Sequence, residues 1–529
     1  MTTTLDIPRE VRPAPRGIWR ALVISEMRRL MTHPAVLVSL AAILALWLVP
    51  FAVNPAGRSF PYLTALSVTV QYPLLLLAGG TFIAANMIAL RPHRHRTYEF
   101  ESVLSMPWWR RTAALAAATL APATIGLLVA GAQLAVQVSA PGAAGVVRPG
   151  ELLAVPAAIV LAGLFGTLVA VASRNTAAGF ISIVVLAIVT FFGLASENRG
   201  RWLTFVAGQN PFAEPPMPAA LLDRPQWWHL TWLLALSAVV VGVTLWLSGL
   251  RPRIVPVATA LSLAVAVLAA TMQLVPPSDE LNQRLAQAQN APAAQQECAV
   301  RGKVTYCAFP EFRSRVDAWS EIVEGQLAVV PRDQAPAALF VRQHLPIATG
   351  NEGTGLPLPL DQWSSDDAAA GTPDAIPVST RWTEGGADSF DETEVIGFSA
   401  WVAAVLITRG QLGADGTELC GGRGVLALWL ATSATPETTK ALATIESHRS
   451  GGGGVVSLAS LNSHAGVIVG PREAALARTL LAADPATVRA AVAANWKELT
   501  APGTDVARAA KLLGRSEPGP AAPGIGICG

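Results

Sequence analysis

The chain has 529 residues, of which 52% are hydrophobic and only 14% are charged, and its formal net charge is +2. This composition excludes an ordinary soluble enzyme, in which about 25% of the residues are charged. No lysine precedes Lys303, and all four cysteines follow residue 297. The chain therefore divides into an apolar first half and a more polar second half, with the boundary near residues 275–280.

The first 33 residues are basic, with six arginines and no evident small-residue cleavage site. We therefore expect a retained cytoplasmic N-terminus rather than a cleaved signal peptide. Residues 17–37 begin with a pattern that predicts an amphipathic helix lying along the membrane interface. Its apolar face carries Trp19, Val23, Met27 and Leu30 or Met31, and Arg20, Arg28 and Arg29 lie away from that face.

Seven apolar runs follow, each free of Asp, Glu, Lys, Arg and His. A membrane-spanning helix needs about 20 apolar residues, whereas a soluble helix of that length keeps a polar face. Buried core helices are the alternative for any single run, but seven such runs favour a polytopic α-helical membrane domain over residues 34–275. The predicted spans are residues 34–53, 63–90, 112–137, 152–173, 176–195, 230–248 and 254–275.

The loop between the second and third spans, residues 91–111, combines a basic surround with a short helical segment. Thr97 is a helix-capping residue, Glu99 and Glu101 suit the first turns of a helix, and Pro107 ends it. This pattern predicts a short helix beneath the membrane that docks into a groove on a partner; a solvated connector is the alternative. The apolar or aromatic side chains that this helix would present are Tyr98, Phe100, Val103 and Leu104.

Arginine placement predicts how the chain is threaded. With a cytoplasmic N-terminus, the inner segments hold fourteen arginines and the short outer loops hold five. An odd number of spans then places the C-terminal part outside the cell. The membrane would be a bacterial plasma membrane.

The cysteines provide an independent indication, because disulfides persist in oxidising compartments. Cys298 and Cys307 flank a predicted hairpin around Gly302, which makes them the expected pair and leaves Cys420 and Cys528. Four cysteines allow three pairings, and the sequence alone does not choose among them. Four free thiols in a cytosolic tail are the alternative.

Charged side chains are absent from the predicted spans, and ion-coupled carriers usually need one there. The chain also lacks a phosphate-binding G-x-x-x-x-G-K-[ST] loop. An ion-coupled carrier is therefore disfavoured. If this protein moves a substrate, we expect the ATPase to be a separate chain.

The C-terminal half predicts a stalk over residues 276–297 and an extracytoplasmic domain over residues 298–529. Its periodicity favours a mostly helical α+β domain, in which residues 392–410 form a buried core helix too short to span a bilayer. No H-E-x-x-H or G-x-S-x-G motif is present, so we expect neither a metal site nor an enzyme. Binding of a substrate, lipid, peptide or partner, or shielding of a pathway exit, is the expected role.

Two segments resemble ATP-binding-cassette (ABC) transporter permeases of the type-two export class. Residues 104–107, "LSMP", are similar to the end of that family's cytoplasmic coupling helix, and residues 17–37 are similar to its connecting helix. The resemblance covers roughly residues 17–250. It departs at Arg96, where the family often has glycine, and in the seventh span with its large tail.

The resemblance implies a permease subunit that exports an unidentified substrate with ATP hydrolysed by a separate cytoplasmic ABC ATPase. ATP and Mg would be bound by that ATPase, and this chain would hold no cofactor. A second permease, identical or different, would complete the pathway, membrane lipids would surround it, and no nucleic-acid partner is expected. The alternative is a membrane-anchored receptor or binding protein that acts through its extracytoplasmic domain.

Overall fold

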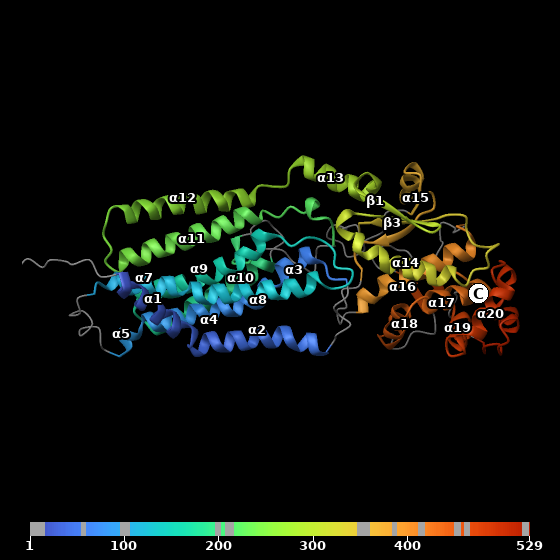
Figure 1. The fold of residues 1–529 in the computed structure, drawn as a ribbon, viewed down its shortest axis with the longest axis horizontal. Helices are drawn as coiled ribbons and strands as arrows, with labels where there is room; N and C mark the ends of the chain where they lie inside the picture. Colours follow the sequence, from blue (N-terminus) through green and yellow to red (C-terminus); the bar gives the residue numbers. More distant parts are fainter. Residues whose placement is uncertain are drawn as a thin grey trace, which may run out of the picture.

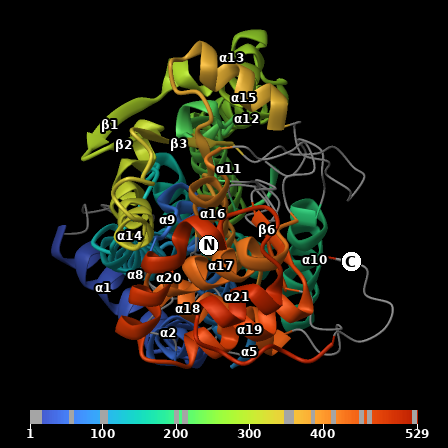
Figure 2. The same ribbon diagram turned by 90° about the vertical axis from the view of Figure 1, so that its right-hand side faces the viewer.

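The computed structural model describes residues 16–53, 60–95, 106–195, 203–206, 216–345, 360–382, 389–410, 418–448, 456–459, 466–520 and 528. The molecule is elongated, with a bundle of long helices parallel to its long axis and a second domain at one end of that bundle (Figure 1). Viewed along the axis, the second domain covers the end of the bundle (Figure 2). The basic N-terminal helix lies at the opposite end, so the bundle has two chemically different ends.

The bundle is built from the apolar runs of the first half of the chain. In its described part, six helices are long and apolar enough to cross a membrane, or seven if α1 and α2, which meet at a bend of 57°, are counted as one span. This supports a polytopic helical membrane protein. The helices are α1 (Arg16–Met31), α2 (Pro34–Val53), α3 (Leu63–Thr69), α4 (Gln71–Ala89), α5 (Arg91–Arg94), α7 (Trp108–Ala118), α8 (Leu120–Val138), α9 (Pro149–Ser173), α10 (Thr176–Ala195), α11 (Gln226–Leu247) and α12 (Ile254–Leu274).

Two of the predicted spans are each divided into two helices. The helices α3 and α7 end at Thr69 and Ala118, and Pro73 and Pro122 follow four residues after these ends. Because proline has no N–H, it cannot donate to the carbonyl four residues earlier, which explains both breaks. The second span therefore consists of α3 and α4, and the third begins at Trp108 rather than at residue 112.

Two other helices begin before the predicted spans and take in ionisable residues. Helix α9 begins at Pro149 and contains Glu151, and α11 begins at Gln226 and contains His229. Both side chains are fully buried. The expectation of charge-free spans is therefore correct for the apolar runs but wrong for the complete helices, because the first turn of a helix lies beyond its apolar stretch.

Small residues hold the centre of the bundle together. A Cβ atom added at Gly166 of α9 would lie 2.3 Å from the Phe82 carbonyl oxygen of α4, so only glycine permits this approach. The Asn86 side chain donates a hydrogen bond of 2.9 Å to the Gly166 carbonyl. Around this centre, α10 and α12 are peripheral and expose large apolar side chains such as Phe191 and Ile254, as expected for helices that face lipid.

The second domain has a four-stranded sheet in the order β1-β2-β3-β4. Strand β1 runs antiparallel to β2, whereas β2, β3 and β4 are parallel. A two-stranded antiparallel sheet, β5-β6, lies elsewhere in the domain. The strands are β1 (Glu297–Arg301), β2 (Val304–Ala308), β3 (Leu339–His344), β4 (Ile376–Ser379), β5 (Val456–Ala459) and β6 (Gly466–Val469).

Helices surround the sheets, and α16 is central among them. From Ile396 to Ala404 its apolar residues are almost entirely buried, so the predicted core helix over residues 392–410 is present and ends at Thr408. The stalk is helical as well, because α13 follows α12 after a short break. The helices of this half are α13 (Asp279–Asn290), α14 (Val316–Leu327), α15 (Leu360–Ala369), α16 (Ser389–Thr408), α17 (Gly421–Ser433), α18 (Pro436–His448), α19 (Pro471–Leu481), α20 (Pro485–Leu499) and α21 (Val506–Leu512).

Two disulfides join the four cysteines. Cys298 and Cys307 are register partners on β1 and β2 and form the pair expected from the hairpin. Cys420, which precedes α17, pairs with Cys528 near the end of the chain. Disulfides are typical of oxidising, extracytoplasmic environments.

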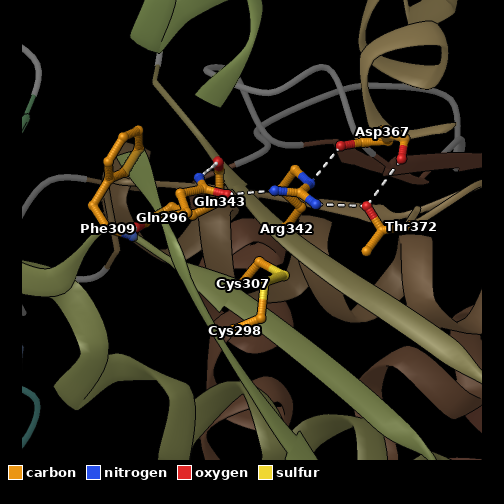
Figure 3. Close-up of a disulfide and its surroundings, with 8 residues drawn as sticks. All are labelled: Gln296, Cys298, Cys307, Phe309, Arg342, Gln343, Asp367 and Thr372. Carbon is orange, nitrogen blue, oxygen red and sulfur yellow. Dashed lines mark hydrogen bonds and ion pairs between the residues drawn. A yellow bond between two sulfur atoms is a disulfide. The ribbon is translucent and has the colours of Figure 1, made fainter. Parts of the chain in front are cut away.

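A buried ion pair lies beside the first disulfide (Figure 3). The Arg342 guanidinium on β3 lies 2.6 Å from the Asp367 carboxylate on α15 and donates to Thr372 and Gln296. His344 stacks on Trp363 with ring centroids 4.2 Å apart. These contacts fix α15 against the sheet.

The disulfides should contribute unequally to stability. Loop-closure entropy predicts a loss of about 3 kcal/mol on removing the bond with a sequence separation of 9, and about 5 kcal/mol for the bond with a separation of 108. Cys420→Ser with Cys528→Ser should therefore destabilise the protein by about 2 kcal/mol more than Cys298→Ser with Cys307→Ser. Chemical unfolding of the full chain in detergent measures this difference, and the reverse order would contradict it.

Candidate functional site

The two ends of the helix bundle hold its charged side chains. One end carries α1, α5 and the turn between α11 and α12, and it is rich in arginine. The other end meets the disulfide-bonded domain and holds paired charges that are buried. The described arginines of the first end are Arg20, Arg28, Arg29, Arg91, Arg94, Arg110, Arg111, Arg174, Arg251 and Arg253.

Helix α1 packs across the basic end of the bundle against α7 and α4. Leu30 is fully buried, and Met27 and Met31 pack against the apolar core of the helix bundle. Val23 is half-buried, and Trp19 exposes 42% of its surface. The predicted basic residues Arg20, Arg28 and Arg29 are exposed.

A cavity of about 500 Å³ opens where α1 meets the ends of α4, α7 and α9. Its wall combines charged and aromatic side chains, including Glu26, Arg29, Arg91, Trp108 and Arg111. Glu26 is only 9% exposed; one carboxylate oxygen accepts a hydrogen bond of 2.8 Å from Arg29, and the other has no partner among the described residues. A partly apolar, mixed-charge concavity of this kind suits a protein side chain or loop better than a small metabolite.

The residues that flank the predicted docking segment lie at this cavity. Thr97, Tyr98, Glu99, Phe100, Glu101, Val103 and Leu104 lie outside the described residues. His95, which precedes them, and Trp108, which follows them, both line the cavity. Pro107 has an extended backbone and directly precedes α7. The described residues on either side of the predicted docking segment, His95 and Trp108, therefore line one concave surface.

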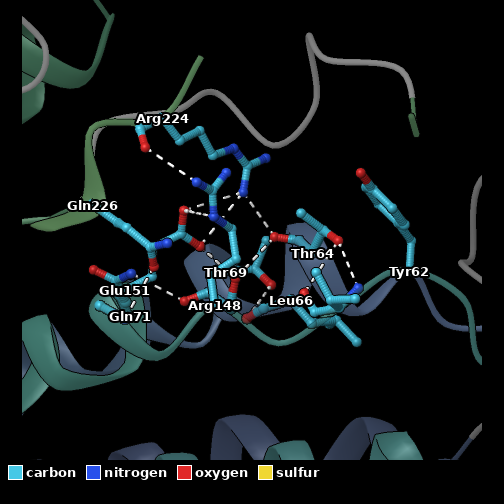
Figure 4. Close-up of polar contacts among 12 residues, drawn as sticks. Tyr62, Thr64, Leu66, Thr69, Gln71, Arg148, Glu151, Arg224 and Gln226 are labelled. Atoms are coloured by element: carbon cyan, nitrogen blue, oxygen red, sulfur yellow. Dashed lines mark hydrogen bonds and ion pairs between the residues drawn. The ribbon is translucent and has the colours of Figure 1, made fainter. Parts of the chain in front are cut away.

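The opposite end of the bundle holds a buried charge cluster that sequence reasoning missed (Figure 4). Both Glu151 carboxylate oxygens lie 3.5 Å from Arg224, and one lies 3.7 Å from Arg148. Arg224 also donates a 2.8 Å hydrogen bond to the Thr64 carbonyl, and Ser67 donates to Glu151. The cluster therefore ties α3, α9 and the segment before α11 together.

A sequence signal for this cluster did exist. Glu151 follows Pro149 in the first helical turn, where proline and an acidic residue are both favoured. Arg148 and Arg224 are two of the five arginines that the predicted topology places in short outer loops, because they fall between predicted spans. Their burial depends on tertiary packing that local patterns do not encode.

The disulfide-bonded domain contacts the same end through a 3₁₀ segment, Pro310–Arg315. The Glu311 carboxylate accepts from the Ala219 N–H at 3.0 Å, and the Glu311 carbonyl accepts from the Gly145 N–H at 3.0 Å. The Arg315 guanidinium donates to the Phe60 carbonyl at 3.0 Å. This joint holds the domain against three separate segments of the bundle, those that contain Ala219, Gly145 and Phe60.

Aromatic packing completes the joint. Phe312 stacks on Tyr62 with ring centroids 5.8 Å apart, and the Tyr62 hydroxyl donates a 2.5 Å hydrogen bond to the Met217 carbonyl. Phe60 contacts Trp382 edge to face. Tyr62 and Phe312 belong to an apolar cluster that the two domains share. Trp382 belongs to the core of the second domain, and Phe60 packs against that core.

Within the described residues, no group of three or more His, Cys, Asp or Glu side chains is arranged to hold a metal ion. No protein-family model, curated protein or solved structure matches this chain. A functional interpretation therefore depends on the two ends of the bundle themselves.

Removing Glu151 should destabilise the bundle, because Arg224, whose side chain is 3% exposed, would lose its carboxylate. Glu151→Ala should cost about 3 kcal/mol in unfolding free energy. The matched control is Glu280→Ala, which removes an exposed pair with Arg284 and should cost about 1 kcal/mol or less. Unfolding of the full chain in mixed micelles measures both, and equal losses would contradict the assignment.

The joint should weaken as pH rises, because burial raises the pKa of Glu311 above its ordinary value, although the Ala219 N–H and Arg148 oppose that shift. A carboxyl group with a raised folded-state pKa stabilises the fold fully below its unfolded pKa of about 4.3, and this contribution is lost as pH rises through the folded-state value. Glu311→Gln, which keeps an oxygen acceptor, should gain thermal stability relative to wild type as pH rises from about 4 to about 7. A gain that is independent of pH would contradict the prediction.

Proposed function

We propose that this protein is the permease subunit of an ABC exporter, which moves an unidentified substrate outward across the plasma membrane. A separate cytoplasmic ABC ATPase, carrying ATP and Mg, docks at the basic end of the bundle and supplies the work. A second permease, identical or different, completes the pathway. The chain itself carries out no chemical reaction.

The observation that supports the proposal is the cavity beneath α1, which is lined by His95 and Trp108, the described residues that flank the predicted docking segment. A helix between His95 and Pro107 would lie over a concave surface formed by α1, α4, α7 and α9. Movement of a docked ATPase would then press on four helices of the bundle at once. The arginines at this end favour the cytoplasmic side, where ATP is available.

The opposite end supports the same orientation. The disulfides favour an oxidising compartment for the second domain. An exporter needs its exit on that side, and the domain covers the end of the bundle there (Figure 2). The domain is therefore placed where it can shield or receive what leaves.

The test reverses the charge of the docking segment. Glu99→Lys with Glu101→Lys should abolish co-purification of an ATPase with the permease in mild detergent. The two glutamates are the acidic groups that this basic segment would present to the ATPase, and the substitutions make them positive. Asp279→Lys with Glu280→Lys on α13 makes the same charge change at the other end and should leave co-purification intact. Insertion into the membrane should be unchanged in both variants. Unchanged co-purification with the first variant would count against the proposal.

A membrane-anchored receptor or binding protein is the second candidate function. It is favoured by a cavity of about 420 Å³ in the outer domain, with Asp333, Asp374 and Arg409 in its wall. Affinity purification distinguishes the two, since a receptor would bring down signalling proteins and no ATPase.

A further inference from the structure

Another cavity at the basic end, of about 320 Å³, lies at the corner where α1 meets α2. Its polar wall is formed by Arg29, Arg91, Arg94, His33 and His95. Among the described residues neither Arg91 nor Arg94 has a carboxylate partner, and the nearby acid Glu26 is paired with Arg29. The cavity therefore has an excess of positive charge and attracts an anion.

Its hydrogen-bond donors also suit an anion. The His33 Nδ1 atom accepts a 3.2 Å hydrogen bond from the Ala35 N–H, so the proton of a neutral His33 ring lies on Nε2. Arginine contributes several planar donors that match the oxygens of a phosphate. The apolar part of the wall, Pro34, Met87 and Ile88, does not suit a fully hydrated ion.

An apolar cavity continues from this corner along the side of the bundle. It is an apolar groove of about 830 Å³ between α2, α4 and α10. Along α4 it extends from Tyr72 to Ile83, about 17 Å at a rise of about 1.5 Å per residue. One leaflet's share of a hydrocarbon core about 30 Å thick is similar, so the groove has the length of an acyl chain.

The basic cavity and the apolar groove are adjacent. Pro34 lines both of them. On α4, Ile83 lines the groove and Met87, one helical turn later, lines the basic cavity. A cationic cavity at the membrane interface thus leads into an apolar channel at membrane depth.

We infer that these two cavities together bind one anionic phospholipid. Its phosphate lies between Arg29, Arg91 and Arg94, and one acyl chain follows the groove between α2, α4 and α10. A zwitterionic lipid binds more weakly, because its own positively charged group is repelled by the arginines. This inference does not depend on the ATPase or on transport.

The test uses the purified full chain in detergent, with native mass spectrometry to count bound 1,2-dioleoylphosphatidylglycerol. Each arginine near a membrane surface contributes about 1 kcal/mol toward an anionic lipid, so Arg91→Gln with Arg94→Gln should weaken binding about 30-fold. Arg251→Gln with Arg253→Gln removes the same charge at the same end, outside both cavities, and should change binding less than about threefold. Equal losses in the two double variants would overturn the site.

The groove is tested separately with glycine substitutions. A Cβ atom at Gly79 would contact only Ile183, at 3.6 Å, so Gly79→Phe fills the groove without a backbone clash. At Gly131 a Cβ atom meets nothing within 4 Å, which makes Gly131→Phe the matched control. Lipid binding should fall with the first variant and persist with the second, and a thermal melt verifies that each is folded. Unchanged binding with a folded Gly79→Phe variant would overturn the placement of the chain.

Two further arms identify the source of the phosphate and the occupant of the groove. Dioleoylphosphatidylcholine should bind more weakly than the phosphatidylglycerol, and inorganic phosphate should not displace the lipid. Equal binding of the two lipids, or displacement by phosphate, would overturn recognition of an anionic lipid. A lipid-free dimer that Gly79→Phe dissociates would instead assign the groove to a second copy of the chain.

Discussion

A bilayer core admits a polypeptide only where its backbone hydrogen bonds are closed within helices and its charges lie near the ends of those helices. The bundle follows this constraint: its arginines gather at one end, and the cluster of Glu151, Arg148 and Arg224 lies at the other. The middle of the bundle is held by small residues and by the Asn86 amide. The charged side chains of the bundle are thus confined to its two ends.

The two ends satisfy their charges in different ways. At the end that meets the second domain, the Glu151 carboxylate is fully buried between two arginines. The second domain contacts the same end through Glu311. At the basic end, arginines line cavities and one Glu26 oxygen has no described partner. Breaking a buried, paired charge is costly, which favours a fixed arrangement at the first of these ends. At the basic end, Arg91 and Arg94 have no carboxylate partner among the described residues and line a concave surface. The basic end is therefore where a partner and a lipid are expected to bind.

The sequence predicted the features that depend on local pattern. Apolar runs located the helices, the hairpin around Gly302 identified Cys298 with Cys307, and the short apolar length of residues 392–410 indicated a core helix. It did not predict features that require distant segments to meet. Glu151 and Arg224 are 73 residues apart, and Cys420 and Cys528 are 108 apart. The cavity of about 500 Å³ likewise lies between α1, α4, α7 and α9, and the periodicity of one helix does not predict a space between several helices.

The outer domain is attached to the bundle twice, and the two attachments differ mechanically. The covalent one runs through α12, which packs mainly on α11, where Gln273 meets the buried His229 ring at 3.1 Å. The non-covalent one is the 3₁₀ segment, in which Glu311 and Arg315 bind backbone groups of Ala219, Gly145 and Phe60. Since those three residues precede α11, α9 and α3, the helices cannot separate at their outer ends without breaking hydrogen bonds to the domain. The domain is therefore a clamp on the outer ends of these helices, and any movement that starts at the basic end must either carry the domain as a unit or open this joint.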